Sequence, residues 1–308
     1  MEWFFSTSLS PSIKKYTMRK KELLNAYLLV SGLVILLGLI IFYPTVEVLI
    51  MSFSHLNPMG NVQAFAGLAN FRHLLIDNPL FFLTLYQTFL WTVSMVVITT
   101  IISLVAAELL NRSFQGRTLM RLAVVLPWTI SPAILAFIWR YIYDGHYGLL
   151  NLVLKNLGII KENISWLAYP NTALPAAIWV GINNSVPFTT LCLLGGLQGI
   201  SSEVYEAAEI DGASGWSRFF YITLPLLKPV FVVVTLFNVI LIFRSFPIIW
   251  VLTRGGPGHF TEIIGTYIYK TAFKALDAQV ASATAIVAMF ILLTFTIFFI
   301  KLSLKEKL

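Results

Sequence analysis

The chain has 308 residues, of which 58% are hydrophobic, 14% aromatic and only 11% charged. Soluble globular domains carry about 45–50% apolar and about 25% charged residues, so this composition is too apolar for a soluble fold. It also excludes a disordered chain, which needs low hydrophobicity and high net charge. The single cysteine, Cys192, excludes a disulfide scaffold and a cysteine-based metal cluster. The composition therefore indicates an integral membrane protein.

Six stretches are long and apolar enough to cross a membrane. A hydrocarbon core about 30 Å thick requires about 20 mostly apolar residues in a helix. None of the six shows the alternating pattern of a transmembrane strand. The sequence therefore predicts an all-α membrane protein with six transmembrane helices. In chain order they cover residues 25–43, which end before Pro44, then 85–107, 122–139, 173–199, 229–251 and 279–300.

The positions of the lysines and arginines predict the orientation. With the N-terminus inside, the inner segments hold 13 of these residues and the outer segments hold six. The positive-inside rule then places both termini in the cytoplasm. We therefore expect a cytoplasmic tail over 1–24, a transmembrane domain over 25–302 in the cell membrane, and a second cytoplasmic tail over 303–308. The net charge of +7 is explained by this inward bias, without a nucleic-acid partner.

The inner connection between the fourth and fifth predicted spans, residues 200–229, has strong local signals for a short helix. Ser202 is a suitable N-cap, and Glu203 and Glu206 follow it where the helix dipole favours negative charge. Gly212 is a suitable left-handed stop. We call residues 200–229 the knob.

A second short helix is expected to follow in the knob. Ser214 is in position to cap it, and Pro225 and Pro229 are expected to end it and to bend the chain into the fifth span. Ala207 and Ala208 give the first helix a face of small side chains. The pattern predicts a helix–turn–helix that projects into the cytoplasm and suits close docking against another protein.

The knob resembles the EAA motif of ABC importer permeases. The matching residues are Glu206, Ala207, Ala208, Asp211, Gly212, Ala213, Phe219, Ile222, Leu224, Pro225 and Pro229. In that family this loop forms the coupling helix, which docks in a groove of a cytoplasmic ATPase subunit. The resemblance implies a type I ABC importer permease fold and an ATPase-coupling role for this motif.

Further motifs make the chain similar to binding-protein-dependent sugar permeases of the maltodextrin and glycerol-phosphate type. They are residues 67–71 (GLANF), the stretch 121–151 around Leu126 and Pro127, and residues 252–257 (LTRGGP). One departure is that Phe243-Arg244-Ser245-Phe246 is followed by Pro247, where many members carry an aspartate. The resemblance implies transport of a carbohydrate or related polyol.

The same resemblance implies a set of partners. They are a second, homologous permease, two ATPase subunits, an extracytoplasmic binding protein that delivers the sugar, and the lipid bilayer. The phosphate-cradling G-x-x-x-x-G-K-[ST] motif is absent from the sequence. We therefore expect this chain to bind no cofactor and to leave ATP and Mg²⁺ to the ATPase.

No catalytic or metal-binding motif stands out in the sequence. H-E-x-x-H and G-x-S-x-G are both absent, so a metalloprotease or serine-hydrolase assignment has no support. The four histidines, His55, His73, His146 and His259, lie in predicted outer segments without ligand-like spacing, so we expect solvated side chains and no metal site.

Polar residues at membrane depth form a candidate substrate site. Asn183, Asn184, Ser185 and Phe188 lie in the fourth span around Pro187, and Asn238 lies at a similar depth in the fifth. Amides suit sugar hydroxyls, and an aromatic ring suits the apolar face of a sugar. In related maltodextrin permeases the sugar is held by these two helices, and the resemblance adds Ser245. Alternatively, these side chains form hydrogen bonds between helices.

Arg244 in the fifth span has several possible roles. Its side chain is long enough to reach the interface, to close a cavity on the outer side, to pair with a carboxylate such as Glu47, or to contact substrate directly.

Two other functions compete with the importer hypothesis. A stand-alone secondary transporter of a small polar solute typically has inverted repeats and broken helices around an ion site, and the sequence shows neither clearly. A membrane enzyme would need a catalytic constellation. The EAA-like motif therefore favours an importer permease.

Overall fold

The computed structural model describes residues 20–57 and 60–305, so residues 1–19 of the predicted N-terminal tail and 306–308 of the C-terminal tail lie outside the described residues. The chain divides into two compact parts, Met1–Val48 and Leu49–Leu308, which are described separately.

The first part is helical throughout its described residues. It contains α1 (Lys20–Leu37), a π-helical turn (Gly38–Phe42) and the start of α2 (Tyr43–Ser52). The prediction that the first span ends before Pro44 is wrong, because the apolar helix continues to Ser52. The backbone N–H of Tyr43 donates to the carbonyl of Gly38, five residues back, and this wider turn accommodates a proline that has no N–H of its own.

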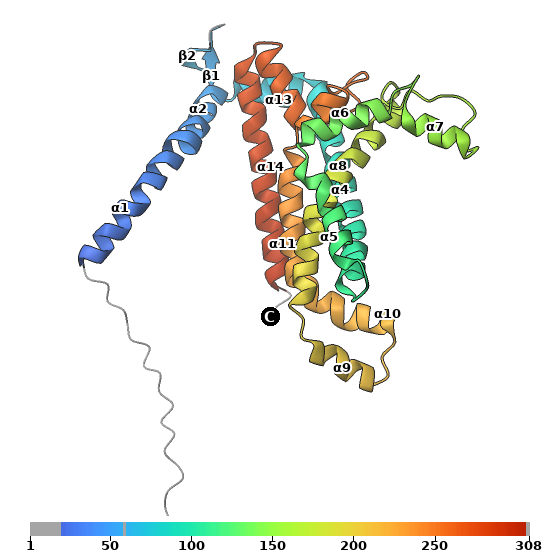
Figure 1. Ribbon diagram of the computed structural model, residues 1–308. Coiled ribbons are helices and arrows are strands. Elements are labelled where there is room, and N and C mark those ends of the chain that lie inside the picture. Colours follow the sequence, from blue (N-terminus) through green and yellow to red (C-terminus); the bar gives the residue numbers. More distant parts are fainter. Residues whose placement is uncertain (1–19, 58–59, 306–308) are drawn as a thin grey trace, which may run out of the picture. The chain divides into compact units, whose positions relative to one another are not determined.

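The second part is a bundle of long helices with shorter helices at both ends (Figure 1). Its elements in chain order are β1 (Ser54–Leu56), β2 (Val62–Phe65), α3 (Ala69–Arg72), a π-helical turn (His73–Asp77), α4 (Pro79–Asn111), α5 (Arg117–Val125), a 3₁₀ turn (Leu126–Thr129), α6 (Pro132–Ile142), α7 (Leu149–Asn156), α8 (Pro170–Gln198), α9 (Ser202–Ile210), α10 (Gly215–Arg218), a π-helical turn (Phe219–Thr223), α11 (Leu224–Phe243), α12 (Pro247–Leu252), α13 (Ile264–Phe273) and α14 (Ala278–Lys305).

β1 and β2 form an antiparallel hairpin with Ser54 opposite Phe65, the one sheet within the described ranges. Asn70 fixes it to the start of α3, because its buried side-chain amide donates to the carbonyls of Ser52, at 3.0 Å, and Ser54, at 2.9 Å. The hairpin is a small addition to a fold that is otherwise helical, as predicted.

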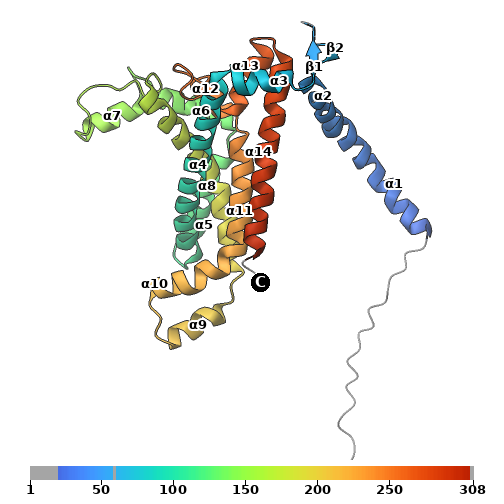
Figure 2. The same cartoon turned by 180° about the vertical axis from the view of Figure 1, so that it is seen from behind.

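Five helical segments in the described ranges are long and apolar enough to cross a membrane: Tyr27–Ser52, Pro79–Asn111, Pro170–Gln198, Gly215–Leu252 and Ala278–Ser303. A sixth span results if the segments Arg117–Thr129 and Pro132–Ile142, bent by 95° at their junction, cross the membrane together. Figures 1 and 2 show α4, α8, α11 and α14 running side by side. Five of the six predicted spans thus match a helix that is long and apolar enough to cross a membrane, and the third matches only if the bent pair counts as one span.

Prolines explain two breaks that the sequence prediction missed. Pro132 begins α6, and the residue before a proline is driven out of helical geometry; Ser131 accordingly has φ −54° and ψ 137°. In the fifth span α11 ends at Phe243 and α12 begins at Pro247. Pro247 has no N–H for the carbonyl of Phe243, and its ring would clash with that carbonyl. The prediction of one continuous helix over 122–139 is therefore wrong. The fifth span is present within Gly215–Leu252, but it is interrupted at residues 244–246.

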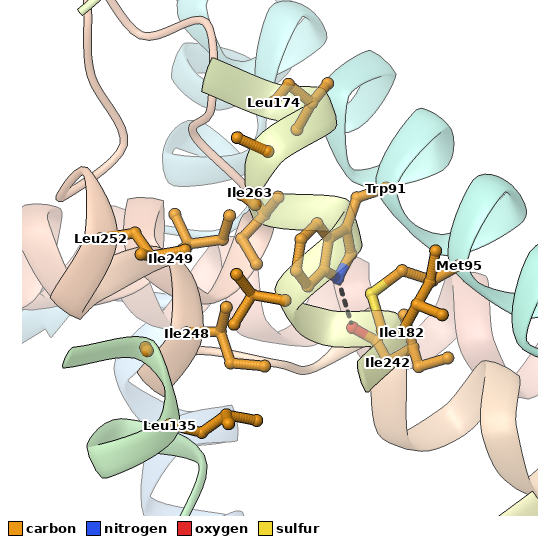
Figure 3. Close-up of a cluster of buried hydrophobic side chains, with 14 of the residues drawn as sticks. Trp91, Met95, Leu135, Leu174, Ile182, Ile242, Ile248, Ile249, Leu252 and Ile263 are labelled. Atoms are coloured by element: carbon orange, nitrogen blue, oxygen red, sulfur yellow. Dashed lines mark hydrogen bonds between the residues drawn. The ribbon is translucent and has the colours of Figure 1, made fainter. Parts of the chain in front are cut away.

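A buried apolar cluster holds α4, α6, α8, α11 and α12 together (Figure 3). At its centre the indole N–H of Trp91 donates to the carbonyl of Ile242, with an N–O distance of 3.1 Å. Met95 lies beside the indole and Ile249 is fully buried. Because this bond joins α4 to α11 near the break in the fifth span, the cluster positions both halves of that span.

Gly181 allows α4 and α8 to approach closely in this cluster. A Cβ added there would lie 2.5 Å from the sulfur of Met95 and 3.1 Å from the Trp91 ring. We expect Gly181→Val to destabilise the folded protein by about 1–3 kcal/mol, the usual cost of overpacking a core. Thermal unfolding of the purified protein in detergent measures this effect. Gly195→Val on the same helix is the control, because a Cβ at Gly195 meets nothing within 4 Å. Equal melting temperatures for the two variants would contradict the prediction.

Candidate functional site

The knob is a helix–turn–helix, as its sequence predicts. Its first helix, α9, is capped by Ser201, whose hydroxyl accepts from the N–H of Glu203 at 3.3 Å; the predicted cap, Ser202, is instead the first helical residue. Gly212 has φ +77°, the left-handed conformation expected of a helix stop. Ser214 caps α10 as predicted, accepting from the N–H of Ser217 at 3.2 Å.

The second half of the knob differs from the prediction. Pro225 and Pro229 do not end the second helix, because α10 continues through a π-helical turn into α11, and both prolines lie inside α11. The wider turn over Phe219–Thr223 accommodates Pro225, which has no N–H to donate to the preceding turn. As a result the knob is joined to the fifth span by continuous helical backbone from Gly215 to Phe243.

The EAA-like residues differ in exposure. Glu206, Ala207, Asp211, Gly212 and Pro225 are exposed, Ala213, Phe219 and Leu224 are half-buried, and Ala208 is buried. Large apolar side chains are exposed on the same knob, with Ile210 at 87% and Trp216 at 75%. A projecting surface that is partly apolar and carries exposed carboxylates is typical of a protein–protein docking site.

Two side-chain contacts hold the knob in shape. The hydroxyls of Tyr205 in α9 and Thr223 at the start of the fifth span lie 3.1 Å apart. The guanidinium of Arg218 in α10 lies 3.4 Å from the carboxylate of Glu209 in α9. These contacts join α9 to α10 and to the turn that leads into α11.

The predicted polar residues of α8 lie next to one another at mid-helix. Asn183, Asn184, Ser185 and Phe188 are all half-buried. The ring of Phe188 lies between two aromatic rings, with centroid distances of 6.0 Å to Trp128 and 5.5 Å to Phe237. Amides beside a set of aromatic faces fit a neutral sugar, whose hydroxyls and ring face need both kinds of group.

Sequence reasoning missed Trp128 and Phe237. Trp128 lies in the 3₁₀ turn before the bend of the third span, directly after Pro127. A tryptophan next to a proline within an apolar span was the signal that could have identified it. Phe237 had no signal in the sequence, because one phenylalanine in an apolar span is indistinguishable from those that face lipid.

Asn238 is placed differently from its predicted role. Its side chain is 3% exposed, and its amide donates to the hydroxyl of Thr189 in α8 at 3.0 Å. This is the alternative that the sequence left open, a hydrogen bond between helices. The geometry therefore argues against Asn238 as a sugar contact.

Arg244 and Ser245 lie at the break between α11 and α12. Arg244 is exposed and borders a hollow of about 500 Å³ between α11, α13 and α14, whose lining contains no residue of α8. Ser245 is half-buried, and its backbone carbonyl packs closely against Gly265. A Cβ added to Gly265 would lie 2.8 Å from the carbonyl oxygen of Ser245. The structure thus does not bring Arg244 to the polar residues of α8, which argues against direct contact with a sugar held there.

An ion-pair cluster in the connection from α12 to α13 was also missed. Glu262 is 2% exposed, and its carboxylate lies 2.9 Å from the ammonium of Lys270 in α13. The same carboxylate pairs with the Nδ1 of His259, so the expectation that this histidine is merely solvated is wrong. Arg254 and His259 both have positive φ, a conformation uncommon for residues other than glycine. The buried carboxylate therefore holds an unusual loop in place.

The comparisons with known proteins agree with one another. Residues 98–307 match the family described as binding-protein-dependent transport system inner membrane component. A probable ABC transporter permease protein of Brucella suis biovar 1 is 40% identical over 281 residues, covering 91% of this chain and 97% of that protein. SmoG, the sulfoquinovosyl glycerol transport system permease protein of Agrobacterium fabrum, is 37% identical over 86% of this chain and 85% of its own. MalF, the trehalose/maltose transport system permease protein of Thermococcus litoralis, is 38% identical over 78% of this chain and 80% of its own.

Two solved structures share the fold. One comes from a bacterial ABC transporter involved in the import of the acidic polysaccharide alginate; it superposes with a TM-score of 0.80 at 22% identity, over 92% of this chain and 98% of that chain. The other comes from a bacterial alginate ABC transporter in complex with an alginate pentasaccharide-bound periplasmic protein, with a TM-score of 0.79 at 21% identity, over 91% and 93% of the two chains. The predicted helical importer-permease fold is confirmed by these likenesses. On the family match and the 40% identical relative, this chain belongs to the family of binding-protein-dependent transport system inner membrane components, the permeases of ABC importers.

Proposed function

We propose that this chain is one of two permease subunits of an ATP-driven importer that carries a carbohydrate or a related polyol. The observation that carries the proposal is the exposed knob, which presents Glu206, Ala207 and Asp211 at one end of a transmembrane bundle. A transport protein that projects a docking surface and has no phosphate-binding loop needs a separate subunit to hydrolyse ATP.

The proposed assembly contains this permease, a second homologous permease, two ATPase subunits and an extracytoplasmic binding protein. ATP and Mg²⁺ are bound by the ATPase subunits, and this chain holds no cofactor and contacts no nucleic acid. Each ATPase receives the knob of one permease. The positive-inside rule supports a cytoplasmic position for the knob and for both termini.

The helical connection from knob to span supports a mechanism. Closure of the ATPase pair on ATP moves the two knobs together. Because helical backbone runs unbroken from Gly215 to Phe243, this displacement moves α10 and α11 together as one helical unit. The spans then open the central site outward, sugar enters from the binding protein, and ATP hydrolysis restores the inward-facing state.

The polar centre of α8 is the proposed sugar site in this chain. Asn183, Asn184 and Ser185 offer hydrogen-bonding groups, and Phe188 offers a ring held between Trp128 and Phe237. Two relatives, SmoG and MalF, are named for substrates that contain a sugar, which supports the same substrate class for this chain.

Uptake of labelled sugars by the complete transporter tests this proposal. We expect Asn184→Ala and Phe188→Ala each to lower the rate of uptake at saturating sugar about tenfold, as for one lost hydrogen bond or stacking contact of about 1.4 kcal/mol. The sugar is identified first, as the ligand that raises the melting temperature of the purified binding protein.

Matched controls are Asn171→Ala, exposed near the outer end of α8, and Phe89→Ala, whose side chain is 62% exposed on α4. Unchanged uptake and sugar preference in both test variants would exclude these residues as sugar contacts. Uptake by this chain alone, without ATP, would instead support a secondary transporter.

A further inference from the structure

A hollow of about 700 Å³ lies between the end of α4 and the knob. One wall is apolar and comes mainly from α4, with Leu104, Val105 and Leu109, completed by Trp216 and Phe219 of the knob. Figures 1 and 2 show α9 and α10 beyond one end of the long helices. The hollow is therefore at a membrane surface, where hydrocarbon meets water.

Two charged side chains of opposite sign line this hollow, one helical turn apart on α4. The Oε1 atom of Glu108 is buried and accepts no hydrogen bond. Arg112 is exposed, and its positive charge attracts the Glu108 carboxylate one turn away, but no salt bridge within 4.0 Å joins its guanidinium to a carboxylate in the part of the chain that the structure describes. Among the other polar side chains that line the hollow, Tyr205 contacts Thr223 and Arg218 pairs with Glu209, while Asn111 offers a further amide.

Apart from their mutual attraction, the side chains of Glu108 and Arg112 have no hydrogen-bond partner among the described residues, so the pair can still bind a ligand with complementary groups. A buried carboxylate oxygen without a donor costs several kcal/mol, so its site favours a cation that has N–H groups. A guanidinium beside it favours a phosphate, which it binds through two N–H groups. Both side chains are satisfied by one molecule that carries an ammonium and a phosphate a few atoms apart. The apolar tails of that molecule would lie along the apolar surface of the helix.

We propose that this hollow binds an aminophospholipid of the phosphatidylethanolamine class. Glu108 accepts from the ammonium, Arg112 donates to the phosphate, and the acyl chains lie along Leu104, Val105 and Leu109. Trp216 suits this position because indole rings prefer the membrane interface. Phosphatidylglycerol lacks the ammonium, the extra carboxylate of phosphatidylserine would be repelled by Glu108, and phosphatidylcholine has no N–H to donate.

The site has a consequence for coupling, and this step rests on the proposed function of the knob. The same lipid contacts α4 on one side and Trp216 and Phe219 on the other. It therefore braces the knob against a membrane-spanning helix, so that the push on the knob is transmitted and not lost by bending of the junction.

Lipid binding is tested directly on the transporter purified with its partner subunits. Native mass spectrometry counts bound lipid after addition of phosphatidylethanolamine, phosphatidylcholine or phosphatidylglycerol. We expect phosphatidylethanolamine to bind about tenfold more tightly than the other two, and Glu108→Gln and Arg112→Gln each to remove this preference. Glu162→Gln, a neutralised exposed acid on an outer connection, is expected to retain it.

Equal binding of the three lipids, or an unchanged preference in Glu108→Gln, would overturn the site. Transport in vesicles then separates the lipid site from the proposed function. We expect uptake to fall stepwise as the ethanolamine is methylated toward choline in the unmodified protein and to be independent of methylation in Glu108→Gln. Equal uptake in every lipid would refute the bracing role. ATP hydrolysis that does not respond to sugar in any of the lipids would instead refute the proposed function and leave the lipid-binding result intact.

Discussion

Replacement of Glu206 by lysine is expected to abolish coupled uptake while leaving the permease folded and inserted. Glu206 is exposed on α9, so its loss costs the fold little. At the proposed docking surface, however, reversal of one charge places a cation where the partner ATPase meets an anion. Such a reversal costs several kcal/mol of binding, so uptake should fall at least about tenfold.

Three measurements on one preparation separate coupling from folding. Uptake of the labelled sugar and ATP hydrolysis stimulated by the binding protein should both fall, and less ATPase should purify with the permease. The melting temperature of the permease should be unchanged. Glu203→Lys is the control, because it reverses the same charge one turn earlier on α9, outside the EAA-like motif. Equal loss in both variants would indicate general electrostatic repulsion, and normal uptake in Glu206→Lys would contradict the coupling assignment.

The knob was predictable from sequence because its signals are local. A serine cap, a glycine with positive φ and a second serine cap each act within four residues, and two of the three predicted positions, Gly212 and Ser214, are confirmed. Ser201 in place of Ser202 is a displacement by one residue between two adjacent serines. Where the stabilising contacts are close in sequence, the sequence determines the structure to about one residue.

Five of the six spans were predictable in position and composition, but the continuity of the helices was not. Pro132 and Pro247 break helices, whereas Pro44, Pro187 and Pro229 lie inside them. The residue type is the same, so the difference depends on whether neighbouring turns widen or other helices compensate for the missing hydrogen bond. That information lies in the packing of α4, α8 and α11 and not in the local sequence.

The candidate substrate site was predicted in part. Composition and depth identified the polar residues of α8, but they could not show that Asn238 bonds to Thr189 or that Arg244 borders a hollow on other helices. Both facts depend on the rotation of a helix about its axis. In an apolar span with almost uniform hydrophobicity, no amphipathic pattern reveals that rotation.

The connection from α12 to α13 offers the second prediction. Neutralisation of Glu262 by Glu262→Gln is expected to destabilise the folded permease by about 2 kcal/mol, less than the 3–5 kcal/mol found when a fully buried ion pair is broken. The reduction follows because the Lys270 side chain is 29% exposed, so water partly replaces the lost carboxylate. His259 also loses its partner, and with it the support for its left-handed backbone.

Thermal unfolding in detergent measures the loss of stability, and hydrogen exchange over residues 253–263 locates it. Asp277→Asn is the matched control. It removes a negative charge from the same outer region, but asparagine retains the cap that the Asp277 carboxylate provides to the N–H of Val280 at 3.0 Å. Loss of stability in both variants by the same amount would attribute the effect to net charge and contradict the assignment to the ion pair.

A double-mutant cycle then isolates the ion pair itself. Lys270→Gln alone removes the ammonium and leaves the buried Glu262 carboxylate with His259 as its remaining ion-pair partner among the described residues, so it should destabilise the protein at least as much as Glu262→Gln. The double variant should be more stable than the sum of the two effects implies, with a coupling energy of about 1–3 kcal/mol. Additive effects would mean that the carboxylate stabilises the loop through other contacts. Hydrogen-exchange protection should be lost over residues 253–263 and retained in the core around Trp91. This result would show that the ion pair stabilises the protein by holding that loop against α13.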